Sequence, residues 1–395
     1  MITLITKLLY IILAVFIFII SLDPGGVILN LKMPLFILLT FLSSFLYLKK
    51  KISIPKSILQ IFLLLHVIPL YSICLASISG NLVDMEYAIG HCKSLLFVYL
   101  FFTLIILDFE KIYKIFFVNG CILATITLII YLYIYFDPIT FRVIYDFTKE
   151  NEIAMLSMRN YYGITVMGTY MKTGPLMFFS YIYALYFMKK NKIRVALILI
   201  NMFAILVAGS RVPVLIGILI TSIYIYENKI NNKYIKYLSF TFFGTAFLAF
   251  ILILASEKTE VSNMVKFGNF ASYMTEIFKG STPLLGAGLG SVFWGEGFGR
   301  FISYSELTYL DLLRIYGLVL GSILIFIFYF PIYILLKNWN SISYKYKHFC
   351  LAYLMYMILS GTNPVLLSST GMFVYSLGLT FVYHYYNKKD FILYG

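Results

Sequence analysis

The chain has 395 residues, of which 61% are hydrophobic and only 12% are charged. Soluble domains are close to half apolar and a quarter charged, so this composition excludes an ordinary soluble domain. The formal net charge of +14 would suit a nucleic acid or an anionic surface, and the distribution of the charges along the chain decides between such partners.

Apolar windows recur from end to end and predict one polytopic membrane domain over residues 1–395. The expected fold class is all-α, an integral membrane bundle of about twelve transmembrane helices. In chain order the predicted helices are 4–22, 33–48, 57–76, 93–108, 114–135, 174–188, 195–209, 212–226, 237–255, 307–336, 349–362 and 367–386.

Basic clusters fall between apolar runs at alternate connections. KKKISIPK (49–56), KKNKIR (189–194) and NKKD (387–390) are examples. Because cytoplasmic connections carry an excess of Lys and Arg, we expect these segments and both termini to be cytoplasmic. The basicity is then a topology signal, and it gives no support for a nucleic-acid partner.

Two connections on the opposite side are long. Residues 136–173 and 256–306 contain most of the extracytoplasmic polar residues together with many aromatic ones. Disordered segments are poor in aromatic residues, so both loops are expected to fold against the outer mouth of the bundle.

Metal and cofactor patterns are missing from the sequence. The four cysteines, at 74, 92, 121 and 350, form no CxxC pair, and the four histidines show no paired-ligand spacing. We therefore expect no metal site and no cofactor.

Arg211 follows Ser210 at the predicted turn between helices 195–209 and 212–226. The topology places this turn at the outer interface. One interpretation is a snorkelling arginine that caps a tight turn. The other is a cation placed for an anionic group, because a guanidinium makes bidentate contacts with phosphate.

A glycine-rich stretch, GAGLGS (286–291), precedes the helix predicted at 307–336. Without a βαβ unit it is no dinucleotide fingerprint, and it indicates a backbone that closely approaches a ligand or another segment. Glu306, at the helix entry, is either a solvated carboxylate or a functional one. Asp311 and Arg314 stand three residues apart, so an ion pair within the helix is one interpretation of these two.

Further outer-side cations are predicted in the large loops. Arg159, Lys172 and Arg300 could each be a solvated loop charge. Together with Arg211 they form a cationic set that fits an anionic head group at the membrane surface.

The order of these motifs resembles that of the O-antigen polymerase and ligase superfamily. The matching residues are GSR (209–211), GAGLGS (286–291), ELTYL (306–310) and RIYGLVLG (314–321). Ligases of that superfamily tend to have a histidine where this chain has Glu306, and Glu306 followed by Tyr309 is similar to the polymerase branch.

The resemblance implies a GT-C-like bundle and a metal-independent inverting glycosyltransferase at the periplasmic face of the bacterial inner membrane. Its substrates would be undecaprenyl-diphosphate-linked repeat units, with a chain-length regulator and a flippase as further partners. Chemistry of this kind needs a base and a cation, for which Glu306 and Arg211 are the candidates. The predicted substrate contacts are Arg159, Lys172, Ser210, Arg300, Tyr309 and Arg314. An O-antigen ligase acting on lipid A core, or a lipid-linked oligosaccharide flippase, stays as an alternative.

Overall fold

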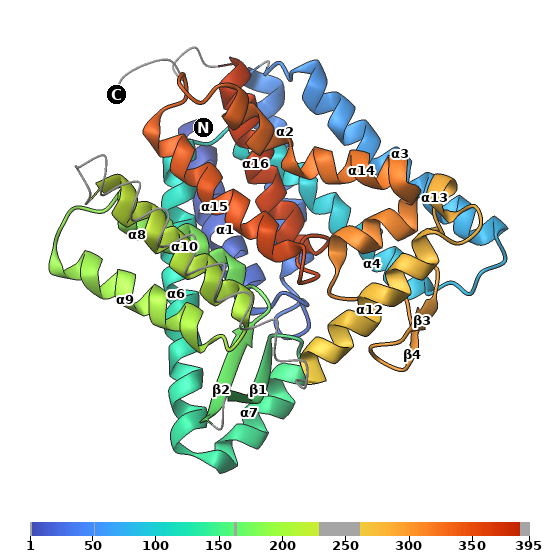
Figure 1. The fold of residues 1–395 in the computed structure, drawn as a ribbon. Coiled ribbons are helices and arrows are strands. Elements are labelled where there is room, and N and C mark those ends of the chain that lie inside the picture. The colour runs from blue at the N-terminus through green and yellow to red at the C-terminus, as the bar shows by residue number, and fades with distance from the viewer. Residues whose placement is uncertain (1, 51, 162–163, 229–260, 388–395) are drawn as a thin grey trace.

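The structure is a computed structural model that describes residues 2–50, 52–161, 164–228 and 261–387. It is mostly helical (Figure 1). The helices are α1 (Ile2–Leu22), α2 (Lys32–Lys50), α3 (Lys56–Ile78), α4 (Met85–Leu95), η1 (Leu96–Tyr99), α5 (Leu100–Leu104), α6 (Phe109–Phe136), α7 (Pro138–Glu150), η2 (Gly174–Leu176), α8 (Met177–Tyr186), α9 (Lys192–Val207), α10 (Arg211–Asn228), α12 (Val261–Ile277), α13 (Thr282–Leu285), α14 (Thr308–Lys337), α15 (Tyr344–Ser360) and α16 (Ser369–Asn387).

Each predicted range overlaps a helix of the structure, except that 237–255 lies outside the described residues. The predicted helix 93–108 is a succession of α4, η1 and α5, which begins at Met85 and ends at Leu104. Within the described part of the chain, six helical segments are long and apolar enough to cross a membrane. They are Thr3–Leu22, Lys32–Lys49, Lys56–Ile78, Met85–Leu104, Phe109–Phe136 and Thr308–Lys337. The protein is therefore a helical membrane protein.

Outward-facing apolar side chains fit this assignment. Phe41 and Leu48 on α2 are 72% and 77% exposed, and Ile78 at the end of α3 is 83% exposed. Water-soluble monomers rarely expose apolar surface that extends along whole helices. These faces are suited to lipid.

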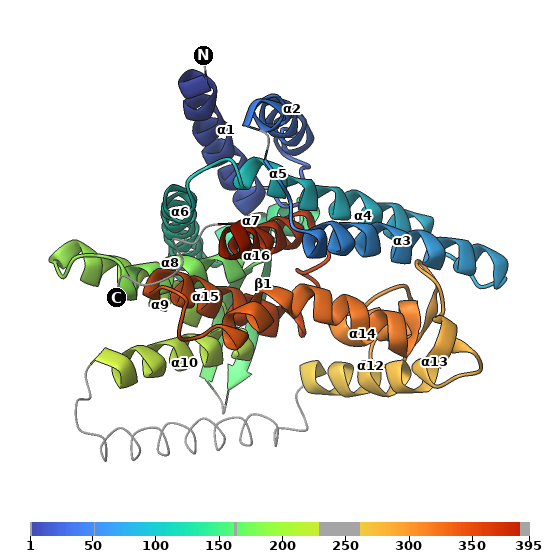
Figure 2. The ribbon, with the colours of Figure 1, turned by 90° about the horizontal axis from the view of Figure 1, so that it is seen from above.

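The core of the bundle forms around α16. This helix packs against η1, α5 and α14, and α6 packs against α8 and α9 on the other side (Figures 1 and 2). The start of α1 and the end of α16 lie at the end of the bundle opposite to α7 and the β1–β2 hairpin.

Both long loops contain β-structure, which the all-α expectation does not include. In the first, β1 (Ala154–Tyr161) pairs antiparallel with β2 (Ile164–Met171). In the second, β3 (Phe293–Gly295) pairs with β4 (Arg300–Ile302). A small core of Tyr273, Ile277, Phe293 and Ile302 joins the second hairpin to α12. Both loops therefore contain helix and strand in the residues that the structure describes.

The long helix α14 is broken at Gly317, which has φ 78° and ψ 169°. L-residues with side chains rarely adopt this conformation, and glycine does so without steric cost. The sequence predicts that the first turns of this 30-residue helix stand above the hydrocarbon. In the structure these turns are a separate helical piece that ends at the break.

Candidate functional site

A pocket of about 350 Å³ opens beside the second hairpin. Most of its lining belongs to the segment that runs from the β3–β4 turn to the start of α14. The lining residues are Asp84, Val292, Phe298, Arg300, Phe301, Ile302, Ser303, Tyr304, Ser305, Glu306 and Pro364. The structure therefore brings together two of the predicted site residues, Arg300 and Glu306.

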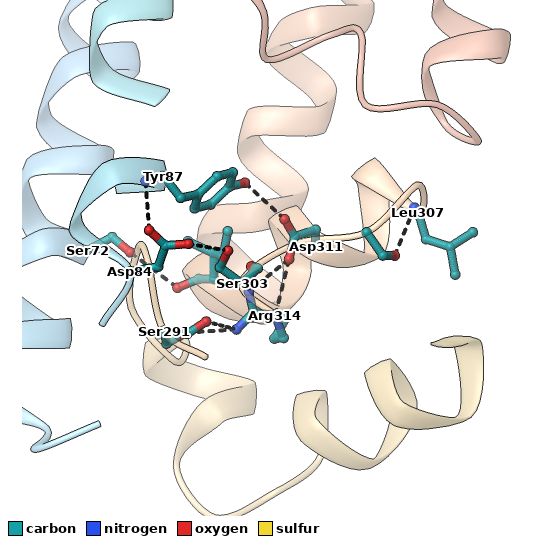
Figure 3. Close-up of polar contacts among 10 residues, drawn as sticks. Ser72, Asp84, Tyr87, Ser291, Ser303, Leu307, Asp311 and Arg314 are labelled. Atoms are coloured by element: carbon teal, nitrogen blue, oxygen red, sulfur yellow. Dashed lines mark hydrogen bonds and ion pairs between the residues drawn. The ribbon is translucent and has the colours of Figure 1, made fainter. Parts of the chain in front are cut away.

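Arg314 closes the base of this hairpin (Figure 3). Its Nη1 donates to the carbonyl oxygen of Ser291 at 3.0 Å and to the Ser291 hydroxyl at 2.7 Å, just before β3. Its Nη2 donates to the carbonyl oxygen of Ser303 at 2.7 Å, just after β4. Nε and Nη2 donate to Oδ1 of Asp311 at 3.1 and 2.9 Å. The ion pair expected from the spacing of three is present.

Every N–H of the Arg314 guanidinium thus has an acceptor within the protein, and the side chain is only 1% exposed. The sequence predicts Arg314 as a substrate contact. In the structure it is a positioning residue, because it joins α14 to both ends of the hairpin and presents no donor to the pocket.

Asp84 is a pocket residue that the sequence analysis does not identify. It caps the N-terminus of α4, where its carboxylate accepts the N–H of Tyr87 at 3.0 Å and the hydroxyl of Ser303 at 2.8 Å. These two hydrogen bonds, the one from Tyr87 being the larger contribution, lower the pKa of Asp84. The sequence signal was an aspartate two residues before Glu86 at the edge of an apolar run, but the helix was expected to begin only at residue 93.

The glycine-rich segment closely approaches other segments of the protein. Gly288 donates its N–H to the carbonyl oxygen of Ile315 at 3.1 Å, and Leu289 donates to that of Ser72 in α3 at 3.1 Å. A Cβ at Gly286 would lie 2.2 Å from the same Ile315 oxygen. The segment therefore satisfies carbonyl groups that the break in α14 leaves without helical partners.

Glu306 has a partner distant in sequence. Its carboxylate lies 3.4 Å from Nζ of Lys266 in α12, and both side chains are about two-fifths exposed. Burial raises the pKa of Tyr170 in β2, and the nearby charge of Glu306 raises it further. The Tyr170 hydroxyl is buried and has no hydrogen-bond partner within the described part of the chain.

Arg211 is the first residue of α10, directly after Ser210 and the tight turn at Gly209, whose φ is 65°. The turn rests on β2, because a Cβ at Gly209 would lie 2.7 Å from Cα of Gly168. Loop 256–306 would have to fold back over this turn for Arg211 and Glu306 to share one site. In the structure the turn contacts β2, the strand that also contains Tyr170, whose pKa the charge of Glu306 raises.

The remaining predicted residues lie elsewhere. Lys172 pairs with Glu152 at 2.9 Å on the surface. Arg159 lies in β1, opposite Val166. Tyr309 points into the bundle, where its hydroxyl contacts that of Tyr329 at 2.9 Å. Lys172 and Tyr309 thus do not line the pocket, and the side chain of Arg159 lies outside the described part of the chain.

Comparison with known proteins identifies no relative, since no protein-family description, no curated protein and no solved structure matches the chain significantly.

Proposed function

We propose that the protein is an O-antigen or surface-polysaccharide polymerase of the bacterial inner membrane. It transfers the growing glycan from undecaprenyl diphosphate to a new lipid-linked repeat unit at the periplasmic face. The observation that carries this proposal is the pocket that places Glu306 and Arg300 beside the first turns of α14, with Asp84 across it at the start of α4.

The side of the membrane follows from charge. The basic connection 189–194 joins the ends of α8 and α9 that lie opposite to β2, and the positive-inside bias makes that end cytoplasmic. Under this orientation about twelve spans cross the bilayer. Loops 136–173 and 256–306, and the pocket with them, then face the periplasm.

The proposed reaction is a single displacement with inversion. A hydroxyl of the acceptor sugar attacks the anomeric carbon of the donor glycan and loses its proton to the Glu306 carboxylate. The new glycosidic C–O bond forms as the bond from the anomeric carbon to the diphosphate oxygen breaks. Arg211 stabilises the negative charge that develops on the departing diphosphate, which a fixed cation can do without a metal.

The hairpin β1–β2 supports the pairing of these two residues. Its strand β2 contacts the Arg211 turn through Gly168 and brings Tyr170 close to Glu306. A buried hydroxyl without a partner needs an explanation, and a bound substrate supplies one. Tyr170 also lines a small pocket with Ala208 and Pro213, which flank the Arg211 turn, so a substrate between this turn and Glu306 would meet its hydroxyl.

The test is polysaccharide gel analysis of a deletion strain complemented with variants. Deletion should leave single repeat units on the lipid A core. Glu306→Gln should reduce polymer by about 10²-fold or more, the usual contribution of a general base. Arg211→Ala should have an effect of about 10²–10³-fold. Glu296→Gln, on the same hairpin, and Lys279→Ala, in the same loop, are matched controls that should restore the full ladder.

Other gel patterns would point elsewhere. Loss of all attached glycan in the deletion strain would indicate a ligase, and repeat units trapped on the cytoplasmic side would indicate a flippase. A full ladder in Glu306→Gln would remove this carboxylate as the base.

A further inference from the structure

We infer that the pocket beside the second hairpin is the subsite for the acceptor sugar, and that it selects an uncharged sugar ring. This inference rests on the proposed function and specifies its substrate. It assigns the pocket to the attacking sugar and not to the lipid diphosphate.

Aromatic side chains form part of the pocket lining and suit a sugar ring. Tyr304 stacks on Tyr87 with ring centroids 4.8 Å apart and an angle of 9° between the planes. One face of the Tyr304 ring is thus fixed by protein, although the side chain is still 47% exposed. Phe298 and Phe301 line the same pocket and are 42% and 64% exposed. The negative face of an aromatic ring attracts polarised C–H groups, which the flat face of a sugar ring presents.

The charges of the pocket lining suit an uncharged ligand. The charged residues in the lining are the carboxylates of Asp84 and Glu306 and the guanidinium of Arg300. Lys266 pairs with Glu306, so these charges balance and the pocket has no surplus cation for a diphosphate or an acidic sugar. Sugar hydroxyls, in contrast, can donate to the carboxylates and accept from Arg300. The lining is therefore complementary to a neutral polyhydroxylated ring.

The protein holds the Asp84 carboxylate of the pocket in a fixed orientation. The Asp84 carboxylate is oriented by the N–H of Tyr87 and by the hydroxyl of Ser303, and its pKa is lowered, so it is ionised at neutral pH. A carboxylate oxygen has two lone pairs, so each oxygen can accept one further hydrogen bond from a sugar. Arg314 fixes the backbone of Ser303 in turn. The hydrogen-bond acceptors are thus in place before a ligand arrives.

The chain offers an internal reporter for this pocket. It has two tryptophans, Trp294 and Trp339. Trp294 contacts the pocket residue Phe301 edge to face, with ring centroids 5.3 Å apart. Trp339 lies between α14 and α15, beneath Nζ of Lys347. Trp339→Phe therefore leaves a single tryptophan beside the pocket.

The experiment titrates the full-length Trp339→Phe protein with methyl galactoside, N-acetyllactosamine and glucuronic acid while Trp294 emission is recorded. A detergent without a sugar head group avoids competition. We expect saturable changes with the neutral saccharides and at least about tenfold weaker binding of glucuronic acid. Asp84→Asn keeps a good helix cap but removes the charge, and it should weaken neutral-sugar binding about tenfold. Tyr304→Leu should do the same, while Glu296→Gln should bind like the parent.

Absence of any saturable response to the neutral saccharides would overturn the inference, and so would tighter binding of glucuronic acid. Equal binding by the parent and by folded Asp84→Asn and Tyr304→Leu, judged from elution volume and thermal unfolding, would also do so. If either variant does not fold, Phe298→Leu on the exposed turn replaces it. A different outcome separates the inference from the proposed function. If the Trp339→Phe protein binds neutral sugars but Glu306→Gln still makes a normal polymer ladder, only the proposed catalytic role of Glu306 is contradicted.

Discussion

Arg314 contributes to the pocket through packing and hydrogen bonding rather than through contact with substrate. It is buried, and its guanidinium connects Asp311, Ser291 and Ser303. It also lies over the ring of Phe293, 4.4 Å from the centroid. A guanidinium has five donors in a planar fork and an ammonium has three on a flexible stem, so lysine cannot replace it here.

We predict that Arg314→Ala lowers the free energy of unfolding by about 3–5 kcal/mol, the usual cost of leaving a buried ion-pair partner alone. The free energy of unfolding of Arg314→Lys should lie between those of Arg314→Ala and the wild type. Thermal unfolding of the detergent-purified protein measures both. Arg142→Ala, an exposed arginine on α7, should change stability by less than about 0.5 kcal/mol. Wild-type stability in Arg314→Ala would contradict the positioning role.

For single side chains, the sequence predicts contacts between residues that are close along the chain and misses contacts between distant ones. The Asp311–Arg314 pair follows from a spacing of three in a helix. The partners Ser291 and Ser303 depend on how a loop folds back, and no periodicity in the sequence reports that. The same holds for Lys266, which lies 40 residues before Glu306 in the chain and pairs with it in space.

Among the secondary-structure elements, the glycine-rich segment packs against the break in α14 so closely that Gly286 has no room for a side chain. Gly286 combines a φ of 87° with backbone contact, and Gly299 has a φ of 60° with open space around it. Alanine at Gly299 therefore tests the conformational cost alone, whereas alanine at Gly286 adds a clash with the carbonyl oxygen of Ile315.

We predict that Gly299→Ala costs about 1–2 kcal/mol, the penalty for a left-handed residue with a side chain. Gly286→Ala should cost clearly more and should also reduce polymer on the gel, because the start of α14 and Glu306 would shift. Thermal unfolding and the gel ladder provide the two measurements. Equal losses of stability in the two variants would show that the close contact has no importance.

The helices were predictable because membrane segments are long and apolar. The β3–β4 hairpin was not predictable, because its strands are short. Strands β3 and β4 have three residues each, which is too few for an alternating pattern. The break at Gly317 was hidden inside a continuous apolar run, RIYGLVLG. Gly317 differs from Gly321 because another segment of the protein packs against it. The sequence of the helix does not specify that segment.

For the whole molecule, the proposed function depends on which end of the bundle faces out of the cytoplasm. The sequence predicts this orientation from the basic connections. In the structure the start of α1 and the end of α16 lie opposite to β1–β2. Accessibility to a membrane-impermeant maleimide tests it directly. A parent without cysteines is made by replacing the four natural ones with alanine.

In spheroplasts, Glu296→Cys on the second hairpin should react from outside, and Lys190→Cys in the connection before α9 should react only after the membrane is permeabilised. Both positions are exposed, so burial cannot explain a difference between them. Reaction of Ser210→Cys from outside would place the Arg211 turn on the same side as the pocket. Labelling of Lys190→Cys in intact spheroplasts, with protection of Glu296→Cys, would show that the bundle has the opposite orientation in the membrane. The pocket would then face the cytoplasm, where a periplasmic polymerase could not use it.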